Sequence, residues 1–467
     1  MLLFAASINA ATFTVTRSDD RDAVCISGVD CSLREAINAA NIRELVDNVH
    51  FAPGITNIVL TDEIQIGREN SDNYGSLSIR GSGANVLTID GGVGTNRIFY
   101  INFRKNVIIS GMTLTGGNGT GAMDSGSGGA IYSQGLEVML RDVHVTGNTA
   151  TSGGGAFFRD YSSATRISNS TFSGNTANVG AGFFCDGSLA IVSSTISDNI
   201  AELTAGGIMF TGLARLVNVT ITNNKANNGG GITKFGNGPI NISNTIIAGN
   251  TATSGVAPDI RFESGSFSSV GGNLVGDSIG DSTNTGANYI SYRTSDIRDV
   301  DPKLDTLKLN GGTTPNHALL AESPAIDAGL NALAFDPFNG NPLLTDQRGF
   351  RRIFDGNNDG VAVVDIGAFE VQQTPTAAMV SLSGKVTDGR RGIANATVQL
   401  TSQDGKTQAV RTNFFGNFRF DEVAAGEMYV ITVQAKRFRF NPLIINVTED
   451  LEGINFVAQQ QLLKNSN

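Results

Sequence analysis

A single pattern repeats five times between residues 140 and 250. Each repeat places alternating apolar and polar residues before a turn and an asparagine, as in LRDVHVTGNT and ISNSTFSGNT. The five asparagines are Asn148, Asn175, Asn199, Asn224 and Asn250. Their separations of 27, 24, 25 and 26 residues are typical of a solenoid, in which each repeat buries its apolar face against its neighbours.

The residues within each repeat favour strands over helices. Short stretches rich in Val, Ile, Thr and Phe alternate with polar residues and are bounded by Gly and Asn. A leucine-rich repeat would require a leucine ladder and a helical half, and neither is present. About 25 residues hold roughly three short strands and three turns, so each repeat is predicted to form one coil of a parallel β-helix. Equivalent asparagines of successive coils would then hydrogen-bond to one another along the axis.

This repeated part of the chain resembles the right-handed parallel β-helix proteins of bacterial surfaces, whose architecture is shared with pectin lyases. The resemblance implies an all-β fold with a right-handed parallel β-helix solenoid, which we expect over residues 50–300. The first coils, before residue 120, and the last, after residue 253, are less regular than those between them.

Composition limits the classes of partner. The chain has 467 residues and a net charge of −10, so binding to nucleic acid is disfavoured, because phosphate contacts require a basic surface. An acidic polysaccharide would be repelled unless a local basic patch or a bridging cation intervened. No apolar run approaches the roughly 20 residues of a transmembrane helix, and no transmembrane segment is expected.

The N-terminal residues favour export, to the cell surface or the extracellular space. Residues 1–11 resemble the end of a secretory signal, although they lack its basic start. Cys25 and Cys31 flank a turn-like segment and are predicted to form a disulfide, which an extracellular location would allow. Cys185 has no histidine nearby in the sequence and is interpreted as a small buried apolar residue.

One helix is predicted, within residues 31–41. Ser32 and Glu35 have the spacing of a capping box, and an apolar face follows at helical spacing. Such a helix within residues 12–49 would close the open end of the first coil. Arg34 is expected on its solvent side. The motif, CSLREAINAAN, resembles the CSLREA domain at the N-terminus of secreted bacterial β-helix proteins.

The sequence changes character after residue 300. Residues 301–370 contain DPKLDTLKLNGGTTPNHALLAESPAIDAG, TDQRGFRR and DIGAFE, and resemble the segment that closes β-helices of the choice-of-anchor Q family, so they are interpreted as a second cap. A linker at 371–380 precedes alternating strands at 381–460, which predict a C-terminal β-sandwich. That part resembles the carboxypeptidase regulatory-like domain. A zinc peptidase is not expected, because no histidine lies in it.

A column of aromatic residues is the first candidate site. Tyr132, Phe158, Phe184 and Phe210 are separated by 26 residues each. If this column faces outward, its rings could stack on the apolar faces of sugars, which predicts a carbohydrate-binding stripe. The alternative is that these rings, and the neighbouring column containing Phe157 and Phe183, are structural, one column inside and the other partly covered.

A calcium loop is the second candidate. Residues 355–360, DGNNDG, have the D-x-N-x-D-G opening of a calcium-binding loop, so Asp355, Asn357, Asp359 and Asp365 could hold a structural calcium. The twelfth position is not a glutamate, so the loop is not an EF-hand. The alternative is a turn rich in Asp and Asn with no metal. No cofactor is otherwise expected.

A catalytic site is the third candidate. Asp160 and Asp186 are 26 residues apart, and Arg159 and Arg166 lie near them in the sequence. No tandem carboxylate pair or complete lyase, hydrolase or peptidase signature is present. The leading expectation is therefore a non-catalytic binding and structural module towards carbohydrate or another cell surface. The alternatives are a polysaccharide lyase or glycoside hydrolase on the outer face of the β-helix, and a passive spacer.

Overall fold

The computed structural model describes two compact units, residues 1–372 and 373–467. Residues not described are 1–9, 44, 68–74, 93–95, 104, 161–163, 237, 254–256, 265–266, 279–289, 373–378, 403–404, 448 and 460–467. Most of the expected signal remnant (1–11) and of the linker (371–380) therefore lies outside the described residues. None of the helices in the described ranges has the length and hydrophobicity that a membrane crossing requires.

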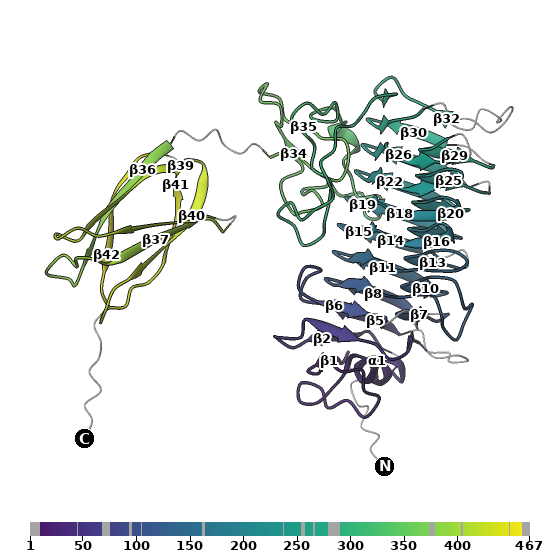
Figure 1. The fold of residues 1–467 in the computed structure, drawn as a ribbon, viewed down its shortest axis with the longest axis horizontal. Helices are drawn as coiled ribbons and strands as arrows, with labels where there is room; N and C mark the ends of the chain where they lie inside the picture. The colour runs from purple at the N-terminus through teal and green to yellow at the C-terminus, as the bar shows by residue number, and fades with distance from the viewer. Residues whose placement is uncertain are drawn as a thin grey trace, which may run out of the picture. The chain divides into compact units, whose positions relative to one another are not determined.

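The first unit is a parallel β-solenoid, and its strands stack coil on coil (Figure 1). The first sheet comprises β1 (Thr12–Val15), β2 (Asp47–Phe51), β5 (Ser76–Arg80), β8 (Asn106–Ser110), β11 (Glu137–Arg141), β14 (Ala164–Ser168), β18 (Ser188–Val192), β22 (Ala214–Val217), β26 (Ile240–Ser243), β30 (Phe267–Gly271) and β32 (Ile290–Ser291). The second sheet comprises β4 (Ile64–Ile66), β7 (Phe99–Ile101), β10 (Ile131–Ser133), β13 (Phe157–Arg159), β17 (Phe183–Cys185), β21 (Ile208–Phe210), β25 (Ile232–Lys234) and β29 (Ile260–Phe262).

Two further sheets complete the coils. The third sheet comprises β3 (Asn57–Val59), β6 (Thr88–Asp90), β9 (Thr113–Thr115), β12 (His144–Thr146), β15 (Thr171–Ser173), β19 (Thr195–Ser197), β23 (Thr220–Thr222), β27 (Ile246–Ile247), β31 (Leu274–Val275) and β33 (Ile297–Arg298). A short fourth sheet comprises β16 (Thr176–Val179), β20 (Ile200–Thr204), β24 (Lys225–Ala226) and β28 (Thr251–Ala252). The predicted parallel β-helix, with short strands and repeated turns, is confirmed.

The repeated asparagines form a buried ladder inside one corner. The side-chain amide of each donates to the side-chain oxygen of the asparagine one coil later, at 2.9–3.0 Å from Asn148 to Asn250. Asn250 in turn donates to the carboxylate of Asp259 at 2.8 Å. At another corner Asn273 donates to Asp296 in the same way, at 3.1 Å. Because one asparagine recurs in each coil, every side-chain amide finds its hydrogen-bond partner in the next coil along this corner.

The predicted helix closes the first end of the solenoid. Helix α1 (Leu33–Asn41) buries its apolar face in the same core as the first strands. Ser32 and Glu35 form the expected capping box, and Cys25 and Cys31 are joined by a disulfide. Arg34 is not a solvent-facing residue, because it pairs with Asp20 at 2.6 Å and its side chain is only 12% exposed.

Residues 301–370 lie along the side of the solenoid, not only across its far end (Figure 1). They contain a 3₁₀ helix (Asn331–Leu333), β34 (Ile353–Phe354) and β35 (Val363–Val364). Thr195 of the third sheet donates to Gln347 at 2.6 Å, and Arg352 donates to the hydroxyl of Ser193 at 3.1 Å. Outward hydroxyls on the third sheet, such as those of Thr195 and Thr220, therefore bind this segment laterally, and its interpretation as a second cap stays a prediction.

The second unit is a small β-sandwich, as predicted. One sheet has the order β39–β36–β42 and the other β38–β37–β40–β41. The strands are β36 (Met379–Thr387), β37 (Thr397–Ser402), β38 (Thr407–Arg411), β39 (Asn417–Ala424), β40 (Glu427–Gln434), β41 (Leu443–Val447) and β42 (Leu451–Val457). Alternate residues of both sheets form one apolar core that includes Leu382, Val398, Phe420 and Ile431.

Candidate functional site

The second sheet carries the aromatic column on its outer face. In β13, Phe157 and Arg159 point into the solenoid and are fully buried, so Phe158 between them points outward. Register stacks Tyr132, Phe158 and Phe184 in that order. Tyr100, in the preceding coil, extends the column at its start.

The next coil ends this aromatic column, so the prediction that Phe210 belongs to it is wrong. Phe184 pairs with Met209, whereas Phe210 pairs with Cys185 and is 1% exposed. The pairs Phe157–Phe183 and Phe183–Ile208 show the reason: the first coil takes 26 residues and the second 25. A residue counted at a fixed spacing of 26 therefore falls on the opposite face of the strand when one coil is a residue shorter.

The outward rings form a continuous stack. The centroids of Tyr132 and Phe158 are 5.4 Å apart with an interplanar angle of 15°. Those of Phe158 and Phe184 are 4.5 Å apart at 4°. Tyr100 and Tyr132 are tilted by 40° at 5.9 Å. Nearly parallel rings on neighbouring coils form a flat apolar strip.

Only part of this strip is accessible. Tyr132 is 2% exposed, because the guanidinium of Arg97 lies 4.8 Å above its ring centre. Arg97 is itself held by Glu63 at 2.7 Å and by backbone carbonyls of residues 119–128. Phe158 and Phe184 are half-buried. The expected carbohydrate stripe thus reduces, as an accessible surface, to these two rings.

Polar side chains line the strip two residues further along each strand. The Tyr132 hydroxyl donates to Asp160 at 2.9 Å, and Gln134 donates to the same carboxylate at 3.3 Å. Burial, together with the bond to Asp160, raises the pKa of Tyr132. Asp186, one coil later, is exposed and accepts from Thr211. A row of hydrogen-bonding groups therefore runs parallel to the rings.

The predicted catalytic cluster does not assemble. Arg159 points into the solenoid and donates to the Ser133 hydroxyl at 2.9 Å, and burial lowers its pKa. Arg166 pairs with Glu137 at 2.5 Å on a different sheet. Asp160 and Asp186 do lie on adjacent coils, but neither arginine faces them.

The predicted calcium ligands are occupied by their own loop. Asp355, Asn357 and Asp359 accept backbone N–H groups two to five residues further along the chain. Asp365 is 1% exposed and accepts two N–H groups elsewhere. Across the described residues, no three His, Cys, Asp or Glu side chains converge as metal ligands. This geometry is that of an Asx-rich turn, and the calcium site stays a prediction.

Three further ionisable groups are buried in the solenoid, and only Cys185 among them was considered from the sequence. Cys185 is buried as expected, and burial raises its pKa to about 12. Lys234 lies inside the solenoid, donates to three turn carbonyls and has its pKa lowered by burial to about 8. Burial raises the pKa of Asp259 to about 6. The inward direction of Lys234, like that of Arg159, could have been found only from the strand register, because each alternates with outward residues along its strand.

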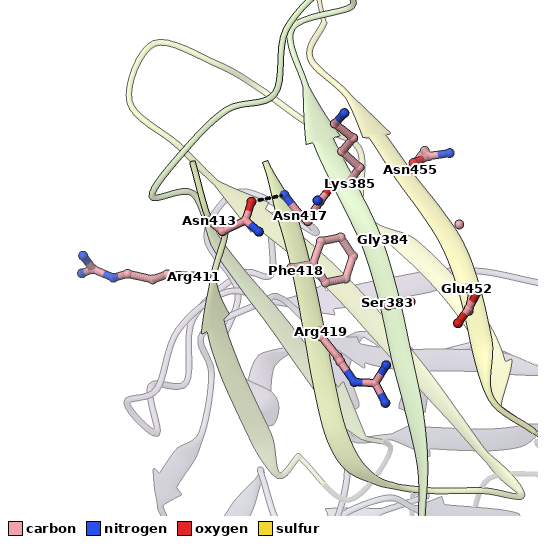
Figure 2. A pocket seen from close by; sticks show the side chains of 11 residues that line it. Ser383, Gly384, Lys385, Arg411, Asn413, Asn417, Phe418, Arg419, Glu452 and Asn455 are labelled. Atoms are coloured by element: carbon pink, nitrogen blue, oxygen red, sulfur yellow. Dashed lines mark hydrogen bonds between the residues drawn. The ribbon is translucent and has the colours of Figure 1, made fainter. Parts of the chain in front are cut away.

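The C-terminal domain has one shallow open depression of about 590 Å³ on its three-stranded sheet (Figure 2). Lys385, Asn417 and Arg419 project from its strands, and Asn413 accepts the backbone N–H of Asn417 at 3.0 Å. Glu452 lines the opposite side.

Comparison with protein families identifies one similarity. Residues 381–451 match the model of the carboxypeptidase regulatory-like domain. This match supports the resemblance noted for the C-terminal part of the chain. Comparison with curated proteins finds none that matches.

Proposed function

We propose that this protein is a non-catalytic binding and structural module whose contact strip on the solenoid binds neutral carbohydrate. The observation that carries the proposal is the nearly parallel pair Phe158 and Phe184, 4.5 Å apart, on the outer face of a rigid sheet. Aromatic faces pack on the apolar faces of pyranose rings. Asp160 and Asp186 border the rings and offer acceptors for sugar hydroxyls.

The charge of the strip favours a neutral ligand. Its two accessible carboxylates would repel uronate or sulfate groups, and the nearby arginines face elsewhere. The proposal also includes export to the extracellular space or a cell surface. The Cys25–Cys31 disulfide supports that location, because disulfides persist in oxidising compartments.

The test is binding and cleavage on one panel of neutral and acidic polysaccharides. We expect retention of the full chain on at least one neutral glycan, with affinity reduced about three- to tenfold in Phe158→Ala or Phe184→Ala. Phe350→Ala is the matched control, because Phe350 is 41% exposed in the lateral segment, away from the strip. Release of new reducing ends or unsaturated uronates would contradict a non-catalytic role. Equal binding by all three variants would contradict the proposal that Phe158 and Phe184 contact the glycan.

A further inference from the structure

Three loops share one end of the C-terminal sandwich. Residues 388–396 join β36 to β37, residues 412–416 join β38 to β39, and residues 435–442 join β40 to β41. The first residue of β37 pairs with the last residues of β38 and β40, so these loops meet at the same end. We call this end the loop end.

The loop end presents two phenylalanines to solvent. Phe414 is 83% exposed and Phe415 is 68% exposed, with ring centroids 5.6 Å apart at 88°. Their turn is well ordered by hydrogen bonds, because Asn413 accepts the N–H groups of Phe415 at 2.9 Å and Asn417 at 3.0 Å. Adjacent exposed rings on a fixed turn are unusual for a surface that contacts only water.

Cationic side chains share this end of the domain with the two rings. Six exposed cationic side chains lie in or beside the three loops: Arg390, Arg391, Arg411, Lys436, Arg437 and Arg439. The part of the chain that the structure describes shows no ion pair for any of them. Asp388 is the one acidic residue in these three loops, and its carboxylate accepts backbone N–H groups of its own turn at 2.6–2.8 Å.

The charge of the domain is therefore segregated. Glu422, Glu427, Glu449 and Asp450 lie at the opposite end, around the β39–β40 and β41–β42 connections. The whole chain carries a net charge of −10, so a basic end is a local feature that overall composition conceals. Such segregation directs the basic end towards a polyanionic partner.

We propose that the loop end docks this protein on an anionic lipid surface. Phe414 and Phe415 would enter the interfacial region of the bilayer while the surrounding arginines and lysines contact lipid phosphates. Perpendicular rings on a convex turn offer no flat platform for a sugar, unlike Phe158 and Phe184. Exposed apolar side chains and cations at the same end instead match the apolar and anionic layers of a bilayer surface.

The experiment is co-sedimentation of the full chain with vesicles of phosphatidylcholine alone or mixed with phosphatidylglycerol. We expect binding to the mixed vesicles that weakens with added salt. The double variant F414A/F415A should reduce partitioning at least about tenfold, and K436Q/R437Q roughly tenfold. The matched controls are Leu344→Ala, at a residue 78% exposed in the solenoid unit, and Lys225→Gln, an exposed lysine of the fourth sheet; both should bind as the unaltered chain does.

Two results would overturn the proposal. The first is no binding to the mixed vesicles at low salt. The second is retention on heparin, used as a soluble polyanion, together with vesicle binding that F414A/F415A does not change, since this would mark a general anion-binding patch. The variants remove side chains that are mostly exposed, so circular dichroism should show unaltered folding.

Discussion

The solenoid interior and the lateral segment satisfy buried polar groups in opposite ways. Inside the coils, one neutral amide bonds to an identical amide in the next coil, from Asn148 to Asn250. In residues 301–370, the buried polar groups include charged and ionisable ones and none repeats: Arg352 is fully buried and lies 3.5 Å from Glu370. A periodic chain can reuse one neutral contact, whereas a single-copy segment needs strong and specific ones.

Removing the buried cation of the lateral segment should have the largest effect. Arg352→Met leaves Glu370 without its cation and removes one of the two donors to each of the carbonyls of Gly367 and Ala368. We expect the free energy of unfolding to fall by about 3–5 kcal/mol, measured by denaturant titration. Arg351→Met, at the exposed neighbouring position, is the control. A loss of similar size in both variants would contradict the assigned role of the pair.

Breaking the amide ladder should have the next largest effect. Asn199→Ala removes the acceptor for Asn175 and the donor to Asn224, both buried. We expect a loss of about 3 kcal/mol in the free energy of unfolding, because two buried polar groups lose a partner. Asn241→Ala, on the outer face of the first sheet, should change it little. Equal stability of the two variants would show that the ladder is not a stabilising element.

The difference between the two regions also predicts that the pH dependence of stability arises mainly from groups in the lateral segment. Burial raises the pKa of Asp365 to about 7 and that of Glu370 to about 9. A carboxyl whose folded pKa exceeds its unfolded value holds its proton more tightly when folded, so stability falls as pH rises from the unfolded towards the folded pKa. For Glu370 this window runs from 4.5 to about 9, and for Asp365 from 3.8 to about 7.

The melting temperature measured across this range should therefore decline, and Glu370→Gln should flatten the upper part of the profile. In the solenoid, Asp259 contributes to this decline up to its pKa of about 6, and the lowered pKa of Lys234, about 8, opposes the decline at higher pH. If Asp259→Asn removed the decline above that pH instead, the assignment to the lateral segment would be contradicted.

The removal of calcium should have the smallest effect on stability. Asp355 and Asp359 already accept N–H groups of their own loop, so chelation with EGTA is expected to leave the melting temperature unchanged. Asp355→Asn serves as the comparison, since it would abolish any calcium-dependent shift. A rise in melting temperature with calcium that this variant loses would show that the loop rearranges around the ion.

The sequence predicted those features that repeat or that depend on neighbouring residues. The Asn ladder follows from its period, and the capping box of Ser32 and Glu35 follows from a local spacing. The position of Phe210 was missed because one coil is a residue shorter. The lateral docking was missed because contacts such as Thr195 to Gln347 join residues 152 apart that share no period.

The candidate site was predictable only in part for the same reason. The spacing of Phe158 and Phe184 shows that they belong to one column, and the pairing of parallel strands makes their rings stack. The cover over Tyr132 is not evident, because Arg97 comes from an earlier coil and is held by a non-repetitive loop. Likewise, whether the Arg159 side chain points inward or outward depends on the strand register, which its neighbouring residues do not reveal.

The amide ladder has a direction, and it ends in a residue that cannot continue it. Each asparagine both accepts and donates, but the carboxylate of Asp259 accepts from Asn250 through one oxygen and from Asp277 through the other. The second row ends in the same way, at Asp296 after Asn273. An ionised carboxylate has no hydrogen to donate. Exchanging amide for acid at one position thus ends the row of side-chain amides at that corner, while the third sheet continues beyond it through β31 and β33.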